Sequence, residues 1–226
     1  MGETVVFDLD GTLADTSADL LTAANAVFCA RGQGAPLDAR ADTSLAFRGG
    51  RAMLAEGYAR TGRAGDIDAD WHAFVAFYTD DIARYTCVYP GAREAVVALR
   101  EAGYICTICT NKPQRQAEIL MRALDFRDDF AALIGADTLP VRKPDPETLR
   151  QSVLRAGGDP GRSVIIGDTV TDRDTGRAAG VPVVLVGFGP EGRGVEALNP
   201  DHVIDTFAEL PDLVARLLPR QKRNTP

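Results

Sequence analysis

The sequence predicts an α/β fold in which a doubly wound parallel sheet is interrupted by an all-helical insertion. Short apolar runs alternate with helical patterns along most of the chain, as is typical of strands buried on both faces. The alternation stops between residues 14 and 87, where only helical patterns occur. Acidic or hydroxyl side chains directly follow several apolar runs. Because such sheets bind ligands at the carboxyl ends of their strands, these side chains indicate the position of a site.

Five apolar runs are expected to form the strands of this Rossmann-like sheet. They cover residues 4 to 9, 104 to 110, 131 to 135, 163 to 167 and 182 to 186. Helical patterns lie between them at residues 92 to 102, 113 to 124, 145 to 156 and 172 to 179. Alternation of this kind predicts right-handed crossovers with helices on both faces of the sheet.

The insertion is expected to form a helical domain of residues 15–87, with residues 1–14 and 88–226 as the α/β core. Its helical patterns fall near residues 17 to 31, 38 to 46, 51 to 61 and 67 to 85. The last pattern carries apolar residues at three-and-four spacing, which indicates the inner face of a small core. Hinges are expected near residues 14 to 16 and 86 to 91.

Composition and charge exclude several classes of protein. The net charge of −7 and pI near 4.9 argue against a nucleic acid or an anionic membrane as partner. No apolar stretch approaches the ~20 residues of a membrane-spanning helix, and no charged-then-apolar leader opens the chain. A cytoplasmic protein is therefore expected. The basic cluster from Arg220 to Arg223 is typical of a frayed tail.

The cysteines are interpreted as structural. Cys106 and Cys109 lie three residues apart on a predicted strand, so their side chains face opposite sides and cannot easily pair. Cys29 and Cys87 are expected to be small buried apolar residues.

The motif Asp8-Leu9-Asp10-Gly11-Thr12 follows the first apolar run. Side chains two residues apart lie on one face of an extended chain, so both carboxylates can address one reacting centre. Gly11 permits a sharp turn of the backbone there. One carboxylate can attack phosphorus, while the other gives the leaving oxygen a proton and later takes one from water. The alternative is that both acids merely end a strand.

A second pair of acids follows the fourth apolar run. A carboxylate is repelled by a phosphate dianion, so this chemistry needs a cation, and Mg²⁺ prefers oxygen ligands. Asp168 lies where the run ends and Asp172 one helical turn later, so both can face the same point. Taken alone, they are equally typical of helix-capping acids.

Two further motifs offer groups for a phosphate. Thr110 and Asn111 precede a helical pattern, where a hydroxyl, an amide and backbone N–H groups form an oxygen cradle; the alternative is a helix cap. Lys143 supplies a point cation, and Pro144 biases its backbone toward extended conformations. A lone lysine is usually just solvated, but this one lies between the second motif, Thr110-Asn111, and the acids Asp168 and Asp172, as the third of four motifs in order.

Together the four motifs resemble those of the haloacid-dehalogenase-like hydrolase superfamily. Their order and spacing are similar to its phosphoglycolate-phosphatase-like branch, over roughly residues 3 to 218. The resemblance implies that Asp8 is the nucleophile and Asp10 the acid/base. Dehalogenases of this superfamily lack an acid at the position of Asp10, so phosphate-ester chemistry is favoured.

The resemblance also implies the binding groups. Thr110 and Lys143 would bind the phosphoryl group, and Asn111 would support the phosphate cradle. The cofactor would be Mg²⁺, held by the carboxylates of Asp8 and Asp168 and by the backbone carbonyl of Asp10. Asp172 would not bind the ion itself but would support these ligands.

The helical insertion resembles the family's cap, which closes over substrate and excludes water. Arg48-Gly49-Gly50-Arg51 lies between two of its predicted helices. Paired glycines let a backbone approach a ligand, and the arginines could clamp a carboxylate or a second phosphate. The alternative is a plain helix–helix turn with solvated arginines.

The function expected is therefore a Mg²⁺-dependent phosphomonoesterase that acts on a small phosphorylated metabolite through an aspartyl-phosphate, with 2-phosphoglycolate as first candidate. One alternative is a phosphosugar mutase, which would keep its phosphoryl group from water and need a bisphosphate primer. A dehalogenase is disfavoured by Asp10. The non-enzymatic alternative is a metabolite-binding protein on the same fold. A monomer or homodimer is expected.

Overall fold

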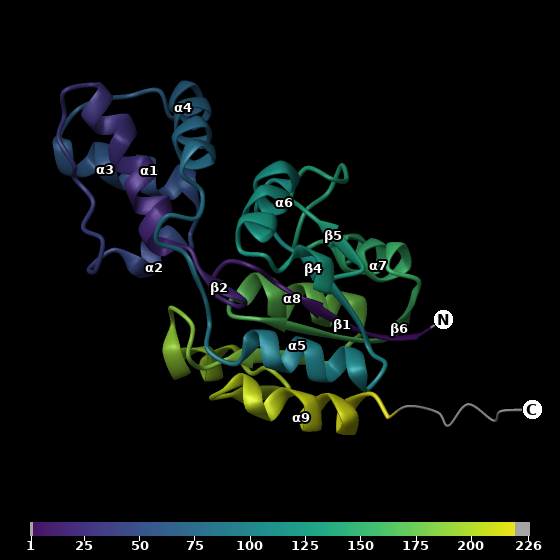
Figure 1. The fold of residues 1–226 in the computed structure, drawn as a ribbon. Coiled ribbons are helices and arrows are strands. Elements are labelled where there is room, and N and C mark those ends of the chain that lie inside the picture. Colours follow the sequence, from purple (N-terminus) through teal and green to yellow (C-terminus); the bar gives the residue numbers. More distant parts are fainter. Residues whose placement is uncertain (1, 220–226) are drawn as a thin grey trace, which may run out of the picture. The chain divides into compact units, whose positions relative to one another are not determined.

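The computed structural model describes residues 2–219, which form two compact units (Figure 1). One unit holds the described residues up to Leu13 and from Val88 onward, and the other is Ala14–Cys87. Within residues 2–219, no helix is both long and apolar enough to cross a membrane. The basic cluster from Arg220 to Arg223 lies outside the described residues.

The first unit contains a six-stranded parallel sheet, which confirms the predicted fold class. The strand order is β5-β4-β1-β6-β7-β8, and every neighbouring pair is parallel. The strands are β1 Gly2–Phe7, β4 Ile105–Cys109, β5 Ala132–Ile134, β6 Gly158–Gly167, β7 Val183–Val186 and β8 His202–Ile204.

Two strands differ from the sequence prediction. The edge strand β8 was missed because its three residues are too short to show an apolar run. Strand β6 begins at Gly158, well before the predicted run, because Gly158 pairs with Gly2. A register shift then places Ser163 opposite Thr4.

Helices cover both faces of the sheet, as the alternating pattern predicted. Figure 1 shows α5 and α9 together on one side, whereas α7 and α8 pack together on the other. The unpredicted helices of this unit are α9 and three short 3₁₀ helices. The helices of this unit are α5 Ala92–Glu101, α6 Gln114–Ala123, α7 Pro146–Arg155, α8 Val170–Ala179 and α9 Leu210–Leu217, and the 3₁₀ helices are Arg127–Asp129, Gly192–Leu198 and Phe207–Glu209.

A fully buried cluster lies between the central strands and α7. Val6 of β1 and Ile165 of β6 pack with Leu149 and Val153 of α7, and each of these side chains is fully buried. Burying a side chain of this size contributes about 1.5–3 kcal/mol. This packing fixes the central strands against α7, and the predicted site residues stand at the carboxyl ends of strands of this sheet.

The second unit consists of α1 Ser17–Ala30, α2 Thr43–Ala46, α3 Gly50–Thr61 and α4 Ile67–Asp80. The short pair β2 Ala14–Asp15 and β3 Cys87–Val88 lies where the chain passes between the units. Two predicted helices were too long. Asp38 accepts the N–H groups of Arg40 and Ala41 in a turn, so a helix begins only at Thr43.

The other overlong helix was expected to reach residue 85. Helix α4 ends at Asp80, and the buried carboxylate of Asp19 accepts the N–H groups of Tyr85 and Thr86. These two amides are therefore not available for helical hydrogen bonds, and the chain runs back toward the first unit without helical structure.

The predicted burial of two cysteines was wrong. Cys29 and Cys87 are exposed, because Cys29 lies on the outer side of α1 after the buried Phe28 and Cys87 lies in the connection between units. All four cysteines are free. Burial raises the pKa of Cys106 to about 12 and that of Cys109 to about 11, so both remain thiols at neutral pH.

Candidate active site

Three neighbouring strands end in the residues that the sequence predicted for the site. Asp8 follows β1, Thr110 follows β4 and Asp168 follows β6, and β1 lies between β4 and β6 in the sheet. The carboxyl ends of parallel strands lie at one edge of a sheet, so the three side chains share that edge.

The turn after β1 brings its backbone against Asp168. Gly11 has a φ of 84°, and a Cβ at this position would overlap the carboxylate of Asp168. Only glycine fits both the backbone angle and the close approach. The next residue, Thr12, is fully buried, and its Oγ1 donates a hydrogen bond of 2.8 Å to Oδ1 of Asp168.

Three acids form a buried cluster at this edge. One carboxylate oxygen each from Asp8, Asp168 and Asp172 lies within 4.8 Å of the others, and all three residues are buried. The ammonium of Lys143 joins them: its Nζ hydrogen-bonds Oδ1 of Asp172 at 2.6 Å and lies 3.0 Å from Oδ1 of Asp8. The structure therefore brings together four of the predicted residues.

The cluster combines negative charge with an unsatisfied carboxylate oxygen, and both suit a divalent cation. With the acids ionised, three carboxylates against one ammonium leave two negative charges. Oδ2 of Asp168 is buried without a hydrogen-bond donor among the described residues, and Oδ1 of Asp8 is paired with the Lys143 ammonium at 3.0 Å. Buried carboxylates are costly unless they are paired or coordinate a metal. These residues therefore fit a divalent metal ion bound by oxygen ligands.

The pKa shifts reflect this crowding. Burial raises the pKa of Asp8 to about 6, although the charge of Lys143 opposes the shift. The pKa of Asp168 is raised well above its usual value by burial and by the charges of Asp172 and Asp8. Burial alone would lower the pKa of Lys143, but Asp172 and Asp8 outweigh burial and raise it. Lys143 thus remains a cation.

Asp172 has two structural contacts at once. It is the third residue of α8, and its Oδ2 accepts the N–H and the hydroxyl hydrogen bonds of Thr169 in a capping box. Its Oδ1 binds Lys143. Asp172 therefore caps α8, and the same carboxylate lies in the buried cluster of acids.

Thr110 and Asn111 lie beside this centre and help to order its loops. Thr110 is buried, its N–H donates to Ile134 O at 2.9 Å, and its hydroxyl accepts from the N–H of Lys112 at 3.2 Å. Asn111 is exposed, and its Nδ2 donates to the carbonyl of Lys143 at 3.1 Å. Asn111 thereby links its own loop to the loop of Lys143, which contains a cis Lys143–Pro144 peptide bond.

Sequence reasoning missed a role for Lys112. Its Nζ lies 2.8 Å from Oδ1 and 3.1 Å from Oδ2 of Asp10, and its side chain is only 3% exposed. The two acids of the first motif thus pair with different lysines, Asp8 with Lys143 and Asp10 with Lys112. The signal was present in the sequence, because Lys112 directly follows Thr110-Asn111.

Comparison with known proteins shows the family of the chain that carries this site. Residues 3–180 match the family of haloacid dehalogenase-like hydrolases. The chain belongs to this family. A relative named phosphoglycolate phosphatase, from Mesorhizobium japonicum, is 40% identical over 95% of this chain and 96% of its own length. Another, from Pseudomonas aeruginosa, is named N-acetylmuramic acid 6-phosphate phosphatase and is 32% identical over 95% of each chain.

A solved structure from Haemophilus somnus, described as a predicted phosphoglycolate phosphatase, has a TM-score of 0.83 at 21% identity and covers 94% of this chain and 97% of its own. This likeness supports the fold alone. The sequence relatives confirm the predicted superfamily and branch, and they indicate that this haloacid dehalogenase-like hydrolase is a phosphatase.

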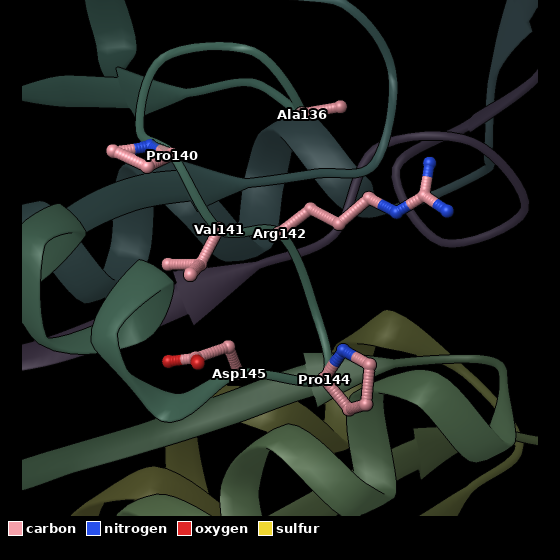
Figure 2. A pocket seen from close by; sticks show the side chains of 6 residues that line it. All are labelled: Ala136, Pro140, Val141, Arg142, Pro144 and Asp145. Atoms are coloured by element: carbon pink, nitrogen blue, oxygen red, sulfur yellow. The ribbon is translucent and has the colours of Figure 1, made fainter.

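An open pocket of this hydrolase lies beside Lys143 in sequence and not at the three-acid cluster (Figure 2). Its lining consists of Ala136, Pro140, Val141, Arg142, Pro144 and Asp145. In Figure 2 the long side chain of Arg142 extends away from Pro140 and Val141. The carboxylate of Asp145 caps α7 by accepting the N–H of Glu147. None of the predicted catalytic side chains lines this pocket.

The arginines predicted to read substrate lie in the helical unit, at the start of α3. Arg48 is exposed. Arg51 pairs with Asp68 of α4, and its guanidinium lies 5.4 Å from the centroid of the Trp71 ring. Arg51 therefore has contacts within its own unit.

The paired glycines of this turn differ from each other. Gly49 has a φ of 92° and precedes α3, with open space at the position of a Cβ. Gly50 is buried, and a Cβ there would overlap the rings of Phe74 and Trp71. Helix packing thus explains Gly50, whereas Gly49 adopts the positive φ that the residue before the helix requires.

Proposed function

We propose that this phosphatase is a Mg²⁺-dependent phosphomonoesterase that acts on a small phosphorylated metabolite, with 2-phosphoglycolate as first candidate. The observation that carries the proposal is the buried cluster of Asp8, Asp168, Asp172 and Lys143 at adjoining strand ends. The 40% identity to a phosphoglycolate phosphatase over nearly the whole chain supports the substrate.

Asp8 is proposed as the nucleophile. Its carboxylate attacks phosphorus, the bond from phosphorus to the leaving oxygen breaks, and an aspartyl-phosphate forms. Asp10 gives its proton to the leaving oxygen, and then takes a proton from the water that cleaves the aspartyl-phosphate. Leu9 separates the two acids and is fully buried, so it anchors the segment that carries them.

The metal is proposed to be Mg²⁺, held by the carboxylates of Asp8 and Asp168 and by the backbone carbonyl of Asp10. When bound, such a cation cancels the repulsion between Asp8 and the phosphate dianion. The buried Oδ2 of Asp168, which has no hydrogen-bond donor among the described residues, supports this assignment. Asp172 is proposed to support the site without binding the ion, because its Oδ1 accepts a hydrogen bond from the ammonium of Lys143.

The phosphoryl oxygens are proposed to meet Lys143 and Thr110. The ammonium of Lys143 lies 3.0 Å from Oδ1 of the proposed nucleophile, where it can neutralise both the carboxylate and the incoming phosphate. Thr110 offers its hydroxyl at the end of β4. Asn111 supports this cradle through its hydrogen bond to the Lys143 carbonyl.

The helical unit Ala14–Cys87 is proposed to be the cap that excludes water during the reaction. Within it, the segment Arg48-Gly49-Gly50-Arg51 is proposed to contact the part of the substrate remote from phosphorus. We further propose that the protein works in the cytoplasm, as a monomer or homodimer.

A second substrate class is favoured by one comparison. The relative from Pseudomonas aeruginosa is named for N-acetylmuramic acid 6-phosphate, a sugar phosphate that also carries a carboxylate. Both candidates therefore combine a phosphate ester with a second anion, and differ in the bulk between the two groups.

A panel of phosphorylated metabolites tests these proposals. The assay compares kcat/KM with Mg²⁺ for 2-phosphoglycolate, N-acetylmuramic acid 6-phosphate and uncharged alkyl phosphates, with excess EDTA as the control. Hydrolysis of 2-phosphoglycolate with the highest kcat/KM is expected, together with loss of activity in EDTA. Turnover that needs a bisphosphate primer would indicate a mutase, and no turnover on any ester would favour a binding protein.

A further inference from the structure

The buried ion pair between Lys112 and Asp10 has no part in the roles proposed so far. The ammonium lies within 3.1 Å of both carboxylate oxygens. The Lys112 side chain is 3% exposed and that of Asp10 is 20% exposed. The lysine thus approaches from the protein interior, and the carboxyl group keeps a side open to solvent. A carboxylate has about four lone-pair sites, so the pairing leaves some of them for a reacting oxygen.

The backbone of Lys112 is held on both sides. Its N–H donates to the hydroxyl of Thr110 at 3.2 Å, and its carbonyl accepts the N–H of Ala136 at 2.9 Å. The N–H of Thr110 in turn donates to Ile134, the last residue of β5. The lysine side chain therefore starts from a point that is fixed to the sheet.

Lysine is rare in this chain, which makes the position informative. The 25 basic residues include three lysines, namely Lys112, Lys143 and Lys222. Two of them are buried against the two acids of the first motif, while Lys222 lies outside the described residues. An ammonium is a compact point charge, whereas a guanidinium is a wide planar group. The compact ammonium of a lysine therefore suits a buried position beside a single carboxylate.

We propose that Lys112 is the positioning residue of Asp10. It holds the carboxyl group where that group gives a proton to the leaving oxygen and later takes one from water. Lys112 keeps its own protons in both steps and contacts neither the substrate nor the metal. This inference rests on the acid/base role proposed above for Asp10.

The effect of losing Lys112 follows from geometry. Asp10 is partly exposed, so loss of the Lys112 ammonium removes a contact that orients its carboxyl group, and the group is held less accurately at the reacting oxygen. A misplacement of about 1 Å can cost on the order of 10²-fold in rate. The loss should fall on reactions whose leaving oxygen needs a proton, and should spare those whose leaving group departs as an anion.

The kinetics of Lys112→Met on three phosphate esters distinguish a positioning role of Lys112 from a structural or substrate-binding role. Ethyl phosphate has a poor leaving group and no second anion, 2-phosphoglycolate has a poor leaving group and a carboxylate, and p-nitrophenyl phosphate has a good leaving group. In Lys112→Met, kcat/KM should fall about 10- to 100-fold on both alkyl esters and remain close to wild type on p-nitrophenyl phosphate. Asp10→Asn should show the same pattern with a larger loss, on the order of 10²–10⁴-fold.

A double-mutant cycle shows whether Lys112 acts through Asp10. In the Asp10→Asn background, Lys112→Met should cause no further loss on ethyl phosphate. Arg115→Met is the matched control, because it removes an exposed cation from the first turn of α6, the helix that follows Lys112. Its rates should equal those of the wild type on all three esters.

Several outcomes would overturn the inference. An equal loss on all three esters would make Lys112 a structural residue, and a rise in KM confined to 2-phosphoglycolate would make it a ligand of the substrate carboxylate. Multiplying losses in the double variant would show that Lys112 and Asp10 act independently. If instead kcat/KM of Asp10→Asn falls equally on all three esters, the proposed acid role of Asp10 itself is wrong.

Thermal unfolding checks that the variants are folded. Should Lys112→Met not fold, Lys112→Arg keeps the charge but displaces it, and is expected to show a smaller loss with the same dependence on leaving group. Wild-type rates for a folded Lys112→Arg on all three esters would overturn the inference as well.

Discussion

The acid cluster of the first unit and the arginine turn of the second unit differ in how their charges are satisfied. At the cluster, the side chains of Lys143 and Asp172 are 2% and 0% exposed and bind each other. At the turn, Arg51 and its partner Asp68 are 57% and 83% exposed. A charge in the cluster depends on the other charges, whereas an exposed ion pair contributes about 0–1 kcal/mol. Groups that act in chemistry away from water are therefore easier to recognise in the structure, by their burial and mutual pairing, than groups that select substrate.

The largest expected effect concerns Asp8. Asp8→Asn should lower kcat by at least about 10⁴-fold on every ester, because an amide cannot form the aspartyl-phosphate; losses of this size are usual when a nucleophile is removed. Mass spectrometry of acid-quenched wild-type enzyme should find phosphate on the peptide that contains Asp8. Label on a serine or histidine would refute this mechanism.

The next effect is on stability without metal. Asp8 has a pKa of about 6 in the folded protein, above its ordinary value of 3.8, so the folded state binds its proton more tightly than the unfolded state does. The stability that this proton provides is complete below pH 3.8 and is lost as pH rises through about 6. In EDTA at pH 7, Asp8→Asn should therefore be more stable than wild type, on the order of 1 kcal/mol per pKa unit of the shift.

Chemical unfolding as a function of pH measures this difference. The advantage of Asp8→Asn should shrink toward zero as pH falls below about 4, where wild-type Asp8 is protonated in both states. Mg²⁺ should stabilise the wild type more than Asp8→Asn, because the ion favours ionised ligands. A pH-independent difference between the two proteins would contradict the burial of an ionisable Asp8 as its cause.

The smallest effects are expected at the arginine turn, where two neighbouring arginines provide a matched pair. Arg48→Ala should raise KM for 2-phosphoglycolate about tenfold, equivalent to ~1.4 kcal/mol, and leave p-nitrophenyl phosphate unaffected. Arg51→Ala should lower the free energy of unfolding by about 0.5–1 kcal/mol through loss of its Trp71 contact, and should raise KM for 2-phosphoglycolate less than Arg48→Ala does, because Arg51 is already paired with Asp68. Unchanged kinetics in Arg48→Ala on both esters would remove it from the binding site.

Three of the four core motifs were predictable because they stand directly after a buried strand. Asp8, Thr110 and Asp168 are separated by many residues, yet a parallel sheet places all strand ends at one edge. Gly11 was predicted to turn the chain, and its φ of 84° agrees. The extents of α2 and α4 were not predictable, because Asp38 and Asp19 bind backbone amides, and side chain–backbone hydrogen bonds of this kind compete with helix formation.

The sequence by itself determined the fold class, the family and the order of the motif residues along the chain, because apolar periodicity and strand-end acids are local patterns. Only the tertiary structure decided which charged side chains contact each other. It assigned Lys143 to Asp8 and Asp172, Lys112 to Asp10, and Arg51 to Asp68 and Trp71. Such pairings depend on distances of a few ångströms between residues far apart in sequence, and local patterns carry no information about those distances.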